Sequence, residues 1–246
     1  MSEGAGAIPR EALLARTFVE LADSLVADFD VVEILTLLAD RCVDVMDVAA
    51  AGLMLASADG QLRVLASSSE ATRILELFEV QADEGPCVDC FRTGLPVVNH
   101  RFDGADDRWP QFGPKAIEAG FKSVHALPMR LRNHTIGALN MYRTDEGRMR
   151  DSDVVAAQAL ADVATIAILQ HRAVQGAQAL NEQLRRALNT RIVIEQAKGV
   201  IAERADLSME EAFSRLRSHA RNHNLRLADV SHAIASKSLA VTALDA

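Results

Sequence analysis

The sequence predicts an α+β N-terminal domain, then one long helix, then a small all-helical C-terminal bundle. Three observations predict this order. Apolar residues recur at helical spacing near the N-terminus, change to short strand-like runs between residues 51 and 142, and return to helical spacing from Asp151. From Asp151 to about Arg204 the only strong helix breakers are two glycines. A capping-box sequence after Leu207 then opens a further helix.

The composition fits a folded intracellular protein. Its 246 residues allow one large domain or two modest ones, and 49% of them are hydrophobic against 24% charged. The N-terminus shows no basic segment leading into an apolar one, and the longest apolar run, residues 48–58, is too short to cross a bilayer. Three cysteines are too few for a disulfide scaffold. We therefore expect a cytoplasmic protein without a membrane partner.

The first domain is expected to place helices on one face of an antiparallel sheet. Asp30 is a predicted helix cap, and Asp59-Gly60 is a predicted hairpin turn. A stretch rich in Gly, Pro and Asp, residues 83–120, is expected to be irregular and to cover a site. The predicted helices lie over 11–29, 31–46 and 71–78, and the predicted strands over 51–57, 62–67, 123–131 and 135–142.

The helix from Asp151 onward is longer than ordinary globular helices, which favours a coiled coil. Ile166, Ala173, Leu180 and Ala187 recur every seven residues and define one seam position. Ala177 and Leu184 define the other seam position, and charged residues continue it, so the seam should end near Ala187. We expect residues 171–188 to join two copies of the chain. The alternative is a single helix packed on its own domain.

The C-terminal stretch differs in charge from the rest of the chain. Residues 185–240 hold 10 Lys/Arg and 6 Asp/Glu, which gives +4; the remainder holds 26 − 10 = 16 basic and 34 − 6 = 28 acidic residues, which gives −12. A basic module on an acidic body indicates that any polyanionic partner meets the C-terminus. Three short helices are expected there, the second with its apolar stripe through Phe213 and the third over 227–239.

Residues 185–240 resemble an ANTAR domain. The resemblance rests on IEQAKGVIAER at Ile194–Arg204 and on the shorter matches that follow in order: LS at 207–208, EAF at 211–213, LR at 216–217, AR at 220–221, and Asn224, Leu227, Asp229 and Val230. Residues 10–170 resemble a GAF domain through EGPCVDCFRTGLPVV (84–98), DRWPQF (107–112) and HALPMRLRNHTIGALNMY (125–142). Asn133-His134 departs from the glycine-containing turn of many relatives, and Asn tolerates positive φ.

The resemblance implies an RNA-binding transcription antiterminator. ANTAR dimers bind tandem hairpins with hexanucleotide loops in nascent RNA and so prevent a terminator from forming. A signal sensed by the GAF domain is then expected to change the packing or register of the 151–187 helix.

RNA recognition needs cations for phosphates and donors for base edges. The predicted cations are Arg191, Lys198, Arg204, Arg217 and Arg221, and Gln196 is the predicted base-edge donor. Gly199 costs roughly 1 kcal/mol in a helix relative to Ala, so we expect close approach of RNA or of another helix there. Phe213 is expected in the core, with base stacking as the alternative.

The N-terminal domain offers weaker chemistry. Cys87 and Cys90 form a single C-x-x-C after Gly-Pro in a predicted loop, which is half a zinc site; they are interpreted as structural, with a redox pair as the alternative. His100, His125 and His134 are the candidates if a haem is bound. The NKFDE signature of cyclic-nucleotide-binding GAF domains is absent. We therefore expect no metal and leave the small-molecule ligand of the GAF domain unidentified.

Two other functions compete with antitermination. The last helices could act as a DNA-binding helix-turn-helix, although no single strongly basic recognition helix is present. The chain could also be a GAF-type methionine sulfoxide reductase using Cys87 and Cys90, although the sequence places no base near them. We therefore expect a regulator rather than an enzyme.

Overall fold

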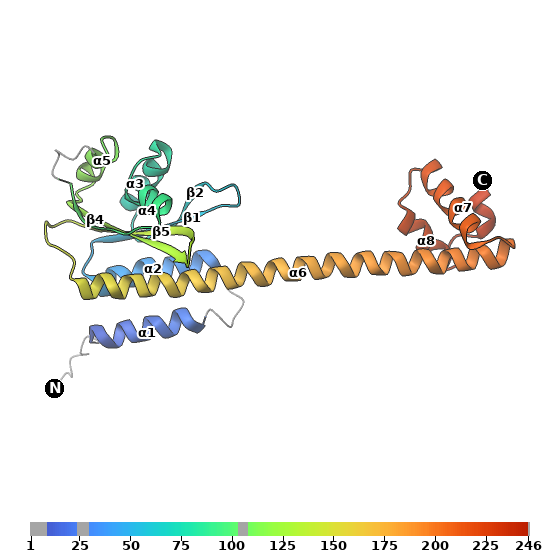
Figure 1. Cartoon of the computed structure of the whole chain (residues 1–246), viewed down its shortest axis with the longest axis horizontal. Coiled ribbons are helices and arrows are strands. Elements are labelled where there is room, and N and C mark those ends of the chain that lie inside the picture. The colour runs from blue at the N-terminus through green and yellow to red at the C-terminus, as the bar shows by residue number, and fades with distance from the viewer. Residues whose placement is uncertain (1–8, 24–29, 103–107, 246) are drawn as a thin grey trace, which may run out of the picture. The chain divides into compact units, whose positions relative to one another are not determined.

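The computed structural model describes residues 9–23, 30–102 and 108–245, and the chain divides into two compact units, Met1–Ala173 and Val174–Ala246. Figure 1 shows the elements, which follow one another as α1 (Arg10–Asp23), α2 (Val31–Met46), β1 (Ala50–Ala56), β2 (Leu62–Ser67), α3 (Glu70–Ala82), α4 (Pro86–Thr93), β3 (Val97–Arg101), α5 (Phe112–Glu118), β4 (Ser123–Leu131), β5 (His134–Arg143), α6 (Asp151–Ala205), α7 (Met209–Asn222), α8 (Leu227–Ala235) and the 3-10 helix η1 (Val241–Asp245).

The first unit is built on a five-stranded sheet with strand order β2-β1-β5-β4-β3. Every pairing is antiparallel, and β1 runs beside β5 with Ala50 opposite Tyr142 and Leu55 opposite Gly137. Because side chains alternate along a strand, each strand supplies residues to both faces of the sheet. The α+β prediction is therefore confirmed.

Helices cover both faces of this sheet, whereas the sequence predicted helices on one face (Figure 1). Residues of α1, α2 and the start of α6 pack on the face that carries Leu53, Leu139 and Met141. Residues of α3, α4 and α5 pack on the face that carries Met54 and Tyr142. The sequence predicted α3, over 71–78, but not α4 and α5, which lie in the stretch expected to be irregular.

The prediction that residues 83–120 are irregular was wrong. This stretch contains α4, β3 and α5. The glycines that indicated a loop lie at element ends: Gly85 precedes α4 with φ 147°, and Gly94 ends α4 with φ 66°. Residues 103–107, which include Gly104, lie outside the described residues.

The predicted helix cap at Asp30 and the predicted turn at Gly60 are present, whereas the β4–β5 turn differs from its prediction. Asp30 caps α2 by accepting a hydrogen bond from the Val32 N–H at 2.7 Å, and Gly60 takes φ 81° in the β1–β2 turn. In the β4–β5 turn the positive φ, 56°, falls on Arg132 rather than on Asn133. The first helix is described over Arg10–Asp23, and the rest of its predicted range, 24–29, lies outside the described residues.

The 55-residue helix α6 contributes buried residues to the cores of both units. Its first part buries Ala157, Leu160 and Ile168 against the sheet, and its last part buries Ala197 and Ile201 in the second unit. By length and composition it is also the one helix among the described residues that could cross a membrane. In its most apolar stretch, 44% is buried inside the protein.

The second unit is a small helical bundle. Its buried core is formed by Ala197, Ile201, Ala212, Leu216, Ala220, Val230, Ile234, Val241 and Leu244. The predicted capping box is present: the Glu211 N–H donates to Ser208 Oγ, and the Ser208 N–H donates to Glu211 Oε2. The predicted third helix ends at Ala235, and a 3-10 turn from Val241 supplies the last core residues.

Candidate nucleic-acid interface

Helix α7 turns back along the end of α6. Only Asp206, Leu207 and Ser208 separate the two helices, and Asp206 takes φ 53°. The Lys198 ammonium then lies 5.5 Å from the centre of the Phe213 ring, which joins the two helices away from the turn. This contact brings the Lys198 and Phe213 side chains together.

The predicted residues on α6 do not share one face. At about 100° of rotation per residue, Arg191 and Lys198 differ by roughly 20°, so both lie on the same side of the helix. Gln196 is turned about 160° from Lys198, and Gly199 about 100°. Of these α6 residues, the structure brings together only Arg191 and Lys198.

On α7, Phe213, Arg217 and Arg221 follow one another at intervals of four residues and form a row along one side. Arg217 and Arg221 are exposed, and Phe213 is half-buried. This row begins at Phe213, which meets Lys198 of α6. We call Arg191, Lys198, Phe213, Arg217 and Arg221 the basic strip.

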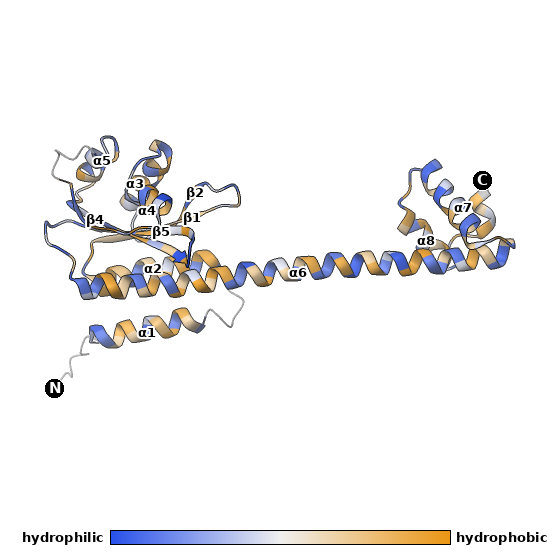
Figure 2. Cartoon of the chain, in the orientation of Figure 1, coloured by the Kyte–Doolittle hydropathy of each residue, from blue (hydrophilic) through white to orange (hydrophobic). Residues whose placement is uncertain are grey.

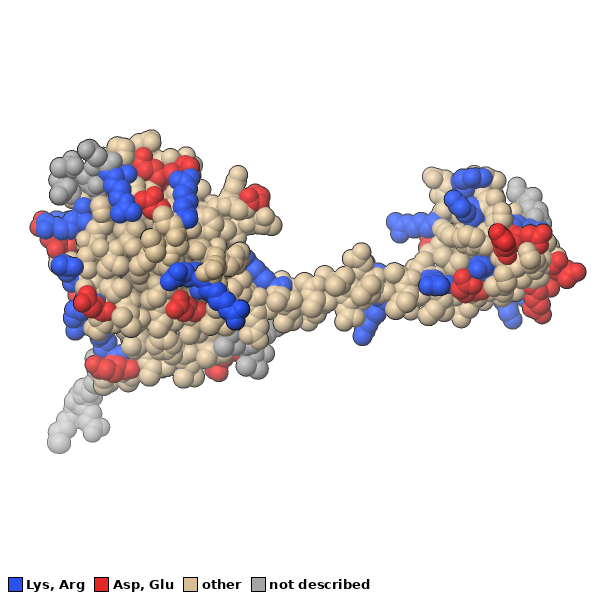
Figure 3. Space-filling view, in the orientation of Figure 1, with Lys and Arg blue, Asp and Glu red and all other residues tan. Residues whose placement is uncertain are grey.

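Acidic residues gather at the other end of α7. Glu203 and Asp206 precede the α6–α7 turn, and Glu210 and Glu211 follow it. Figure 3 shows acidic side chains gathered at the end of the second unit, with some basic ones beside them. Arg204 is exposed, but it lies at this acidic end and is turned about 120° from Lys198. The structure therefore separates Arg204 from the basic strip.

Lys198 differs from the other cations because it already has partners. Its Nζ lies 2.9 and 3.1 Å from the two Glu195 carboxylate oxygens, and its side chain is only 17% exposed. Arg191, Arg217 and Arg221 are exposed. A phosphate would reach these arginines directly but would have to compete with Glu195 for Lys198.

Gly199 lies open on the surface of α6. A Cβ at this position would meet nothing within 4 Å among the described residues. Packing against another helix of the same chain therefore does not explain this glycine. A second copy or a nucleic acid would both have room to approach it.

The sequence did not single out Arg226, an exposed cation that directly precedes α8. It also assigned Phe213 to the core, whereas this ring lies outside the buried core cluster. The apolar stripe could not distinguish a core position from one at the edge of α7.

Large apolar side chains continue along the exposed part of α6. Leu180, Leu184, Leu188 and Ile192 are 56, 55, 60 and 53% exposed. Figure 2 shows hydrophobic residues recurring along this part of the helix. Leu188 and Ile192 continue the exposed apolar face beyond Ala187, near which the predicted seam ends.

The first unit holds a pair of buried carboxyl groups that the sequence did not predict. Glu76 and Glu79 of α3 are both fully buried. The Cys87 and Val88 N–H groups at the start of α4 donate to Glu79 Oε1 at 2.5 and 3.2 Å, and Asn140 Nδ2 donates to Glu79 Oε2 at 3.0 Å. The Ser67 hydroxyl donates to Glu76 Oε2 at 2.6 Å. Helical glutamates usually face solvent, so the sequence carried no signal for this pair.

Burial favours the neutral form of both carboxyls. Desolvation raises the pKa of Glu79 to about 8, although its hydrogen bonds oppose the shift. Desolvation also raises the pKa of Glu76 well above its usual range. Gly52 makes room for the pair, because a Cβ there would lie 2.0 Å from Glu76 Oε1.

The two cysteines lie in the first turns of α4 rather than in the predicted loop. A helix N-terminus can stabilise a thiolate, but here Glu79 already accepts the N–H groups at that end. Both thiols are buried; burial raises the pKa of Cys90 to about 12 and that of Cys87 well above its usual range. This environment favours inert structural thiols.

The three haem candidates lie in different environments. His125 is buried on β4, where its Nδ1 accepts the Asn99 N–H at 3.0 Å and burial lowers its pKa to about 4. His100 packs on Trp109 with ring centres 4.4 Å apart, and His134 is exposed at the start of β5. Within the described ranges, no three His, Cys, Asp or Glu side chains are placed to hold a metal ion.

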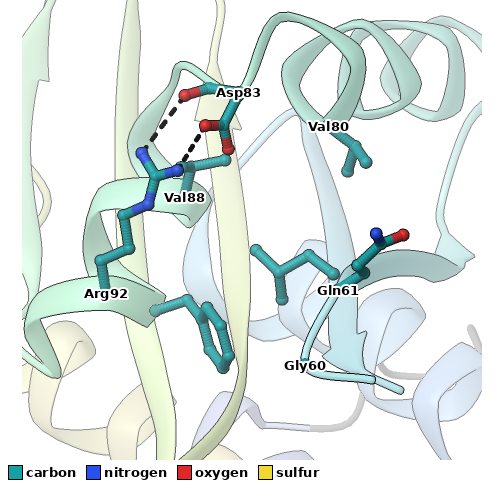
Figure 4. A pocket seen from close by; sticks show the side chains of 8 residues that line it. Gly60, Gln61, Val80, Asp83, Val88 and Arg92 are labelled. Carbon is teal, nitrogen blue, oxygen red and sulfur yellow. Dashed lines mark hydrogen bonds and ion pairs between the residues drawn. The ribbon is translucent and has the colours of Figure 1, made fainter. Parts of the chain in front are cut away.

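Among the described residues, two pockets open beside α3 in the first unit. One, of about 350 Å³, lies between the β1–β2 turn, the end of α3 and α4 (Figure 4). Arg92 lines it and forms an ion pair with Asp83. The other, of about 410 Å³, lies between α3 and α5 and is lined mainly by apolar side chains such as Ile74 and Phe78.

Comparison with known families agrees with this architecture. Residues 30–169 match the GAF domain family and residues 182–234 match the ANTAR domain family. The chain belongs to the GAF domain proteins. It is a GAF and ANTAR domain-containing regulator, as its sequence resemblance predicted. No curated protein matches the chain.

Solved structures share the fold of the first unit. A GAF domain of a phosphoenolpyruvate-protein phosphotransferase from Coxiella burnetii is 13% identical, with TM-score 0.52, over 69% of this chain and 99% of that chain. Free methionine-R-sulfoxide reductase from Neisseria meningitidis is 14% identical, with TM-score 0.52, over 71% of this chain and 98% of that chain. A domain of a sensor histidine kinase from Sinorhizobium meliloti is 16% identical, with TM-score 0.51, over 61% and 99%. At these identities the likeness concerns the fold alone.

Proposed function

We propose that the protein is an RNA-binding transcription antiterminator. In this proposal two ANTAR modules of a homodimer hold paired stem-loops of a nascent transcript, and the held RNA does not form the terminator hairpin. The observation that carries the proposal is the basic strip on the module that matches the ANTAR family. Exposed arginines suit phosphates of a bent RNA backbone.

The exposed apolar face of α6 supports the dimer. Leu180, Leu184 and Leu188 are each more than half exposed, which is costly for large apolar side chains in a free helix. A second copy of the same helix would cover them and would present two ANTAR modules together. The dimer forms in the cytoplasm, where transcripts emerge.

The sensor unit regulates RNA binding through α6. This helix contributes Ile168 to the sensor core and Ile201 to the core of the ANTAR module, so a repacking at one end can be transmitted along one element. The signal is a small molecule bound by the GAF domain, and the pockets beside α3 are its candidate sites. The protein is not an enzyme in this proposal, because both thiols of the C-x-x-C are buried.

The decisive experiment is a gel-shift titration of the full chain at fixed salt. The probes are an RNA with two adjacent hairpins bearing six-nucleotide loops, the same RNA with one hairpin deleted, and a DNA duplex of equal length. The proposal expects preference for the paired hairpins. Preference for the duplex would replace it with the DNA-binding alternative.

A transcription assay through a terminator tests the second half of the proposal. The template encodes the paired hairpins overlapping the terminator, and added protein should increase read-through. Unchanged read-through with bound RNA would leave an RNA-binding protein that is not an antiterminator.

A further inference from the structure

Phe213 occupies an unusual place for a large aromatic residue. It is half-buried, it lies outside the buried core cluster of its unit, and it stands in the row of α7 that continues with Arg217 and Arg221. A ring bordered by exposed cations is the combination with which proteins hold unpaired nucleotides, because the cations take phosphates and the ring takes a base.

The ring is covered by one side chain of α6. Lys198 Nζ lies 5.5 Å from the ring centre and 2.9 Å from Glu195 Oε2. The Lys198 ammonium is thus held by a carboxylate on its own helix and by the face of an aromatic ring on the next helix. A phosphate near Lys198 offers this ammonium a stronger partner than the ring.

We propose that Phe213 is a stacking platform for one unstacked base of an RNA loop, and that Lys198 covers it until RNA binds. On binding, a loop phosphate draws the Lys198 ammonium away from Glu195, and a base takes its place against the ring. The inference rests on the proposed function and adds to it the side chain that stacks on a base of the loop. In the free protein, the Glu195–Lys198–Phe213 contact protects the ring from water.

The first test compares Phe213→Leu with Phe213→Trp in the full chain, using the paired-hairpin RNA as probe. Leucine keeps an apolar side chain but removes the aromatic face, so affinity should fall about 5- to 150-fold, the range found when a stacked aromatic is removed. Tryptophan keeps an aromatic face and should restore affinity. Thermal unfolding of each variant is measured, and equal weakening by both substitutions would assign Phe213 a structural role only.

The salt dependence separates stacking from charge. Lys198→Ala should reduce the slope of log affinity against log salt by about 0.7 to 0.9, because one phosphate contact is lost. Phe213→Leu should lower affinity at every salt concentration and leave the slope unchanged, because stacking releases no counterion. A changed slope in Phe213→Leu would contradict the stacking role.

A fluorescent base gives the direct readout. With 2-aminopurine placed at successive loop positions, one position should be quenched by the wild type and by Phe213→Trp but not by Phe213→Leu. Glu195→Gln should tighten RNA binding, because it frees Lys198 from its carboxylate partner. If the wild type binds the RNA and no loop position responds to Phe213, the inference fails while the proposed function stands; if the wild type does not bind this RNA, the proposed function itself fails.

Discussion

Glu79 of α3 and Asn140 of β5 are joined inside the sensor by a hydrogen bond of 3.0 Å, from the Asn140 amide nitrogen to the Glu79 carboxylate. The other Glu79 oxygen accepts the first N–H groups of α4. One buried side chain thus connects α3, α4 and the centre of the sheet.

Replacing Glu79 with Leu should destabilise the sensor strongly. The substitution leaves the Cys87 and Val88 N–H groups and the Asn140 amide without their acceptor, and each unsatisfied buried group costs about 1–3 kcal/mol. Denaturant unfolding followed by circular dichroism measures the change. The control is Glu70→Leu on the same helix, an exposed residue paired with Arg73, which should change stability little. Equal effects of the two substitutions would refute the role assigned to Glu79.

Stability should decrease as the pH rises from about 4.5 to about 8. The folded-state pKa of Glu79 is raised to about 8, whereas the unfolded chain releases this proton near its usual value of 4.5. Between these values the folded state binds more protons than the unfolded state, so raising the pH favours unfolding by up to about 1.4 kcal/mol per pH unit for one proton. Glu76, whose pKa is also raised, acts in the same direction.

Urea unfolding at a series of pH values checks this dependence, with Glu79→Gln as the comparison. Glutamine has no proton to lose, so the pH dependence of the variant should be flatter. A steeper dependence in Glu79→Gln would contradict the assignment.

Gly52→Ala should destabilise the sensor by about 1–3 kcal/mol, as overpacking of a core does. Its Cβ would lie 2.0 Å from Glu76 Oε1, so the buried carboxyl would have to move. Gly113→Ala is the matched control, because a Cβ there meets nothing within 4 Å. Thermal unfolding should separate the two variants; identical melting temperatures would show that Glu76 does not pack on Gly52.

Gly199→Ala should have opposite effects on stability and on binding. An alanine inside α6 meets nothing within 4 Å, so the variant should be more stable by up to about 1 kcal/mol. If RNA or a second copy approaches Gly199 closely, the added methyl group should weaken RNA affinity or dimerisation. Thermal unfolding measures the stability, gel shift measures the RNA affinity, and sedimentation measures dimerisation. An increase in stability with both interactions intact would leave Gly199 without a binding role.

Charges on the exposed apolar face of α6 should prevent dimerisation. Leu184→Glu and Leu188→Glu place carboxylates where the second copy is expected, and buried unpaired charges are costly. Sedimentation equilibrium of the full chain measures the association. Gln183→Glu is the control, since Gln183 is exposed and turned about 100° from Leu184. Unchanged association in both leucine variants would mean that α6 does not form the interface.

The sequence by itself determined the elements that depend on local chemistry. The Ser208 capping box, the Asp30 cap and the turn at Gly60 need only neighbouring residues, so their signals were readable. The period of the apolar residues located the long helix, and the order of short motifs identified both domain families. These features were predictable because residues form them with partners only a few positions away in the chain.

Only the tertiary structure decided which side chains meet. Glu76 and Glu79 carry no sequence mark of burial; they are buried because α3 lies on the sheet, where Gly52 of β1 leaves room for Glu76. Likewise, Phe213 lies outside the buried core cluster and contacts Lys198 of α6 instead. Periodicity gives the face of a helix, whereas the packing of one helix on another decides what that face contacts.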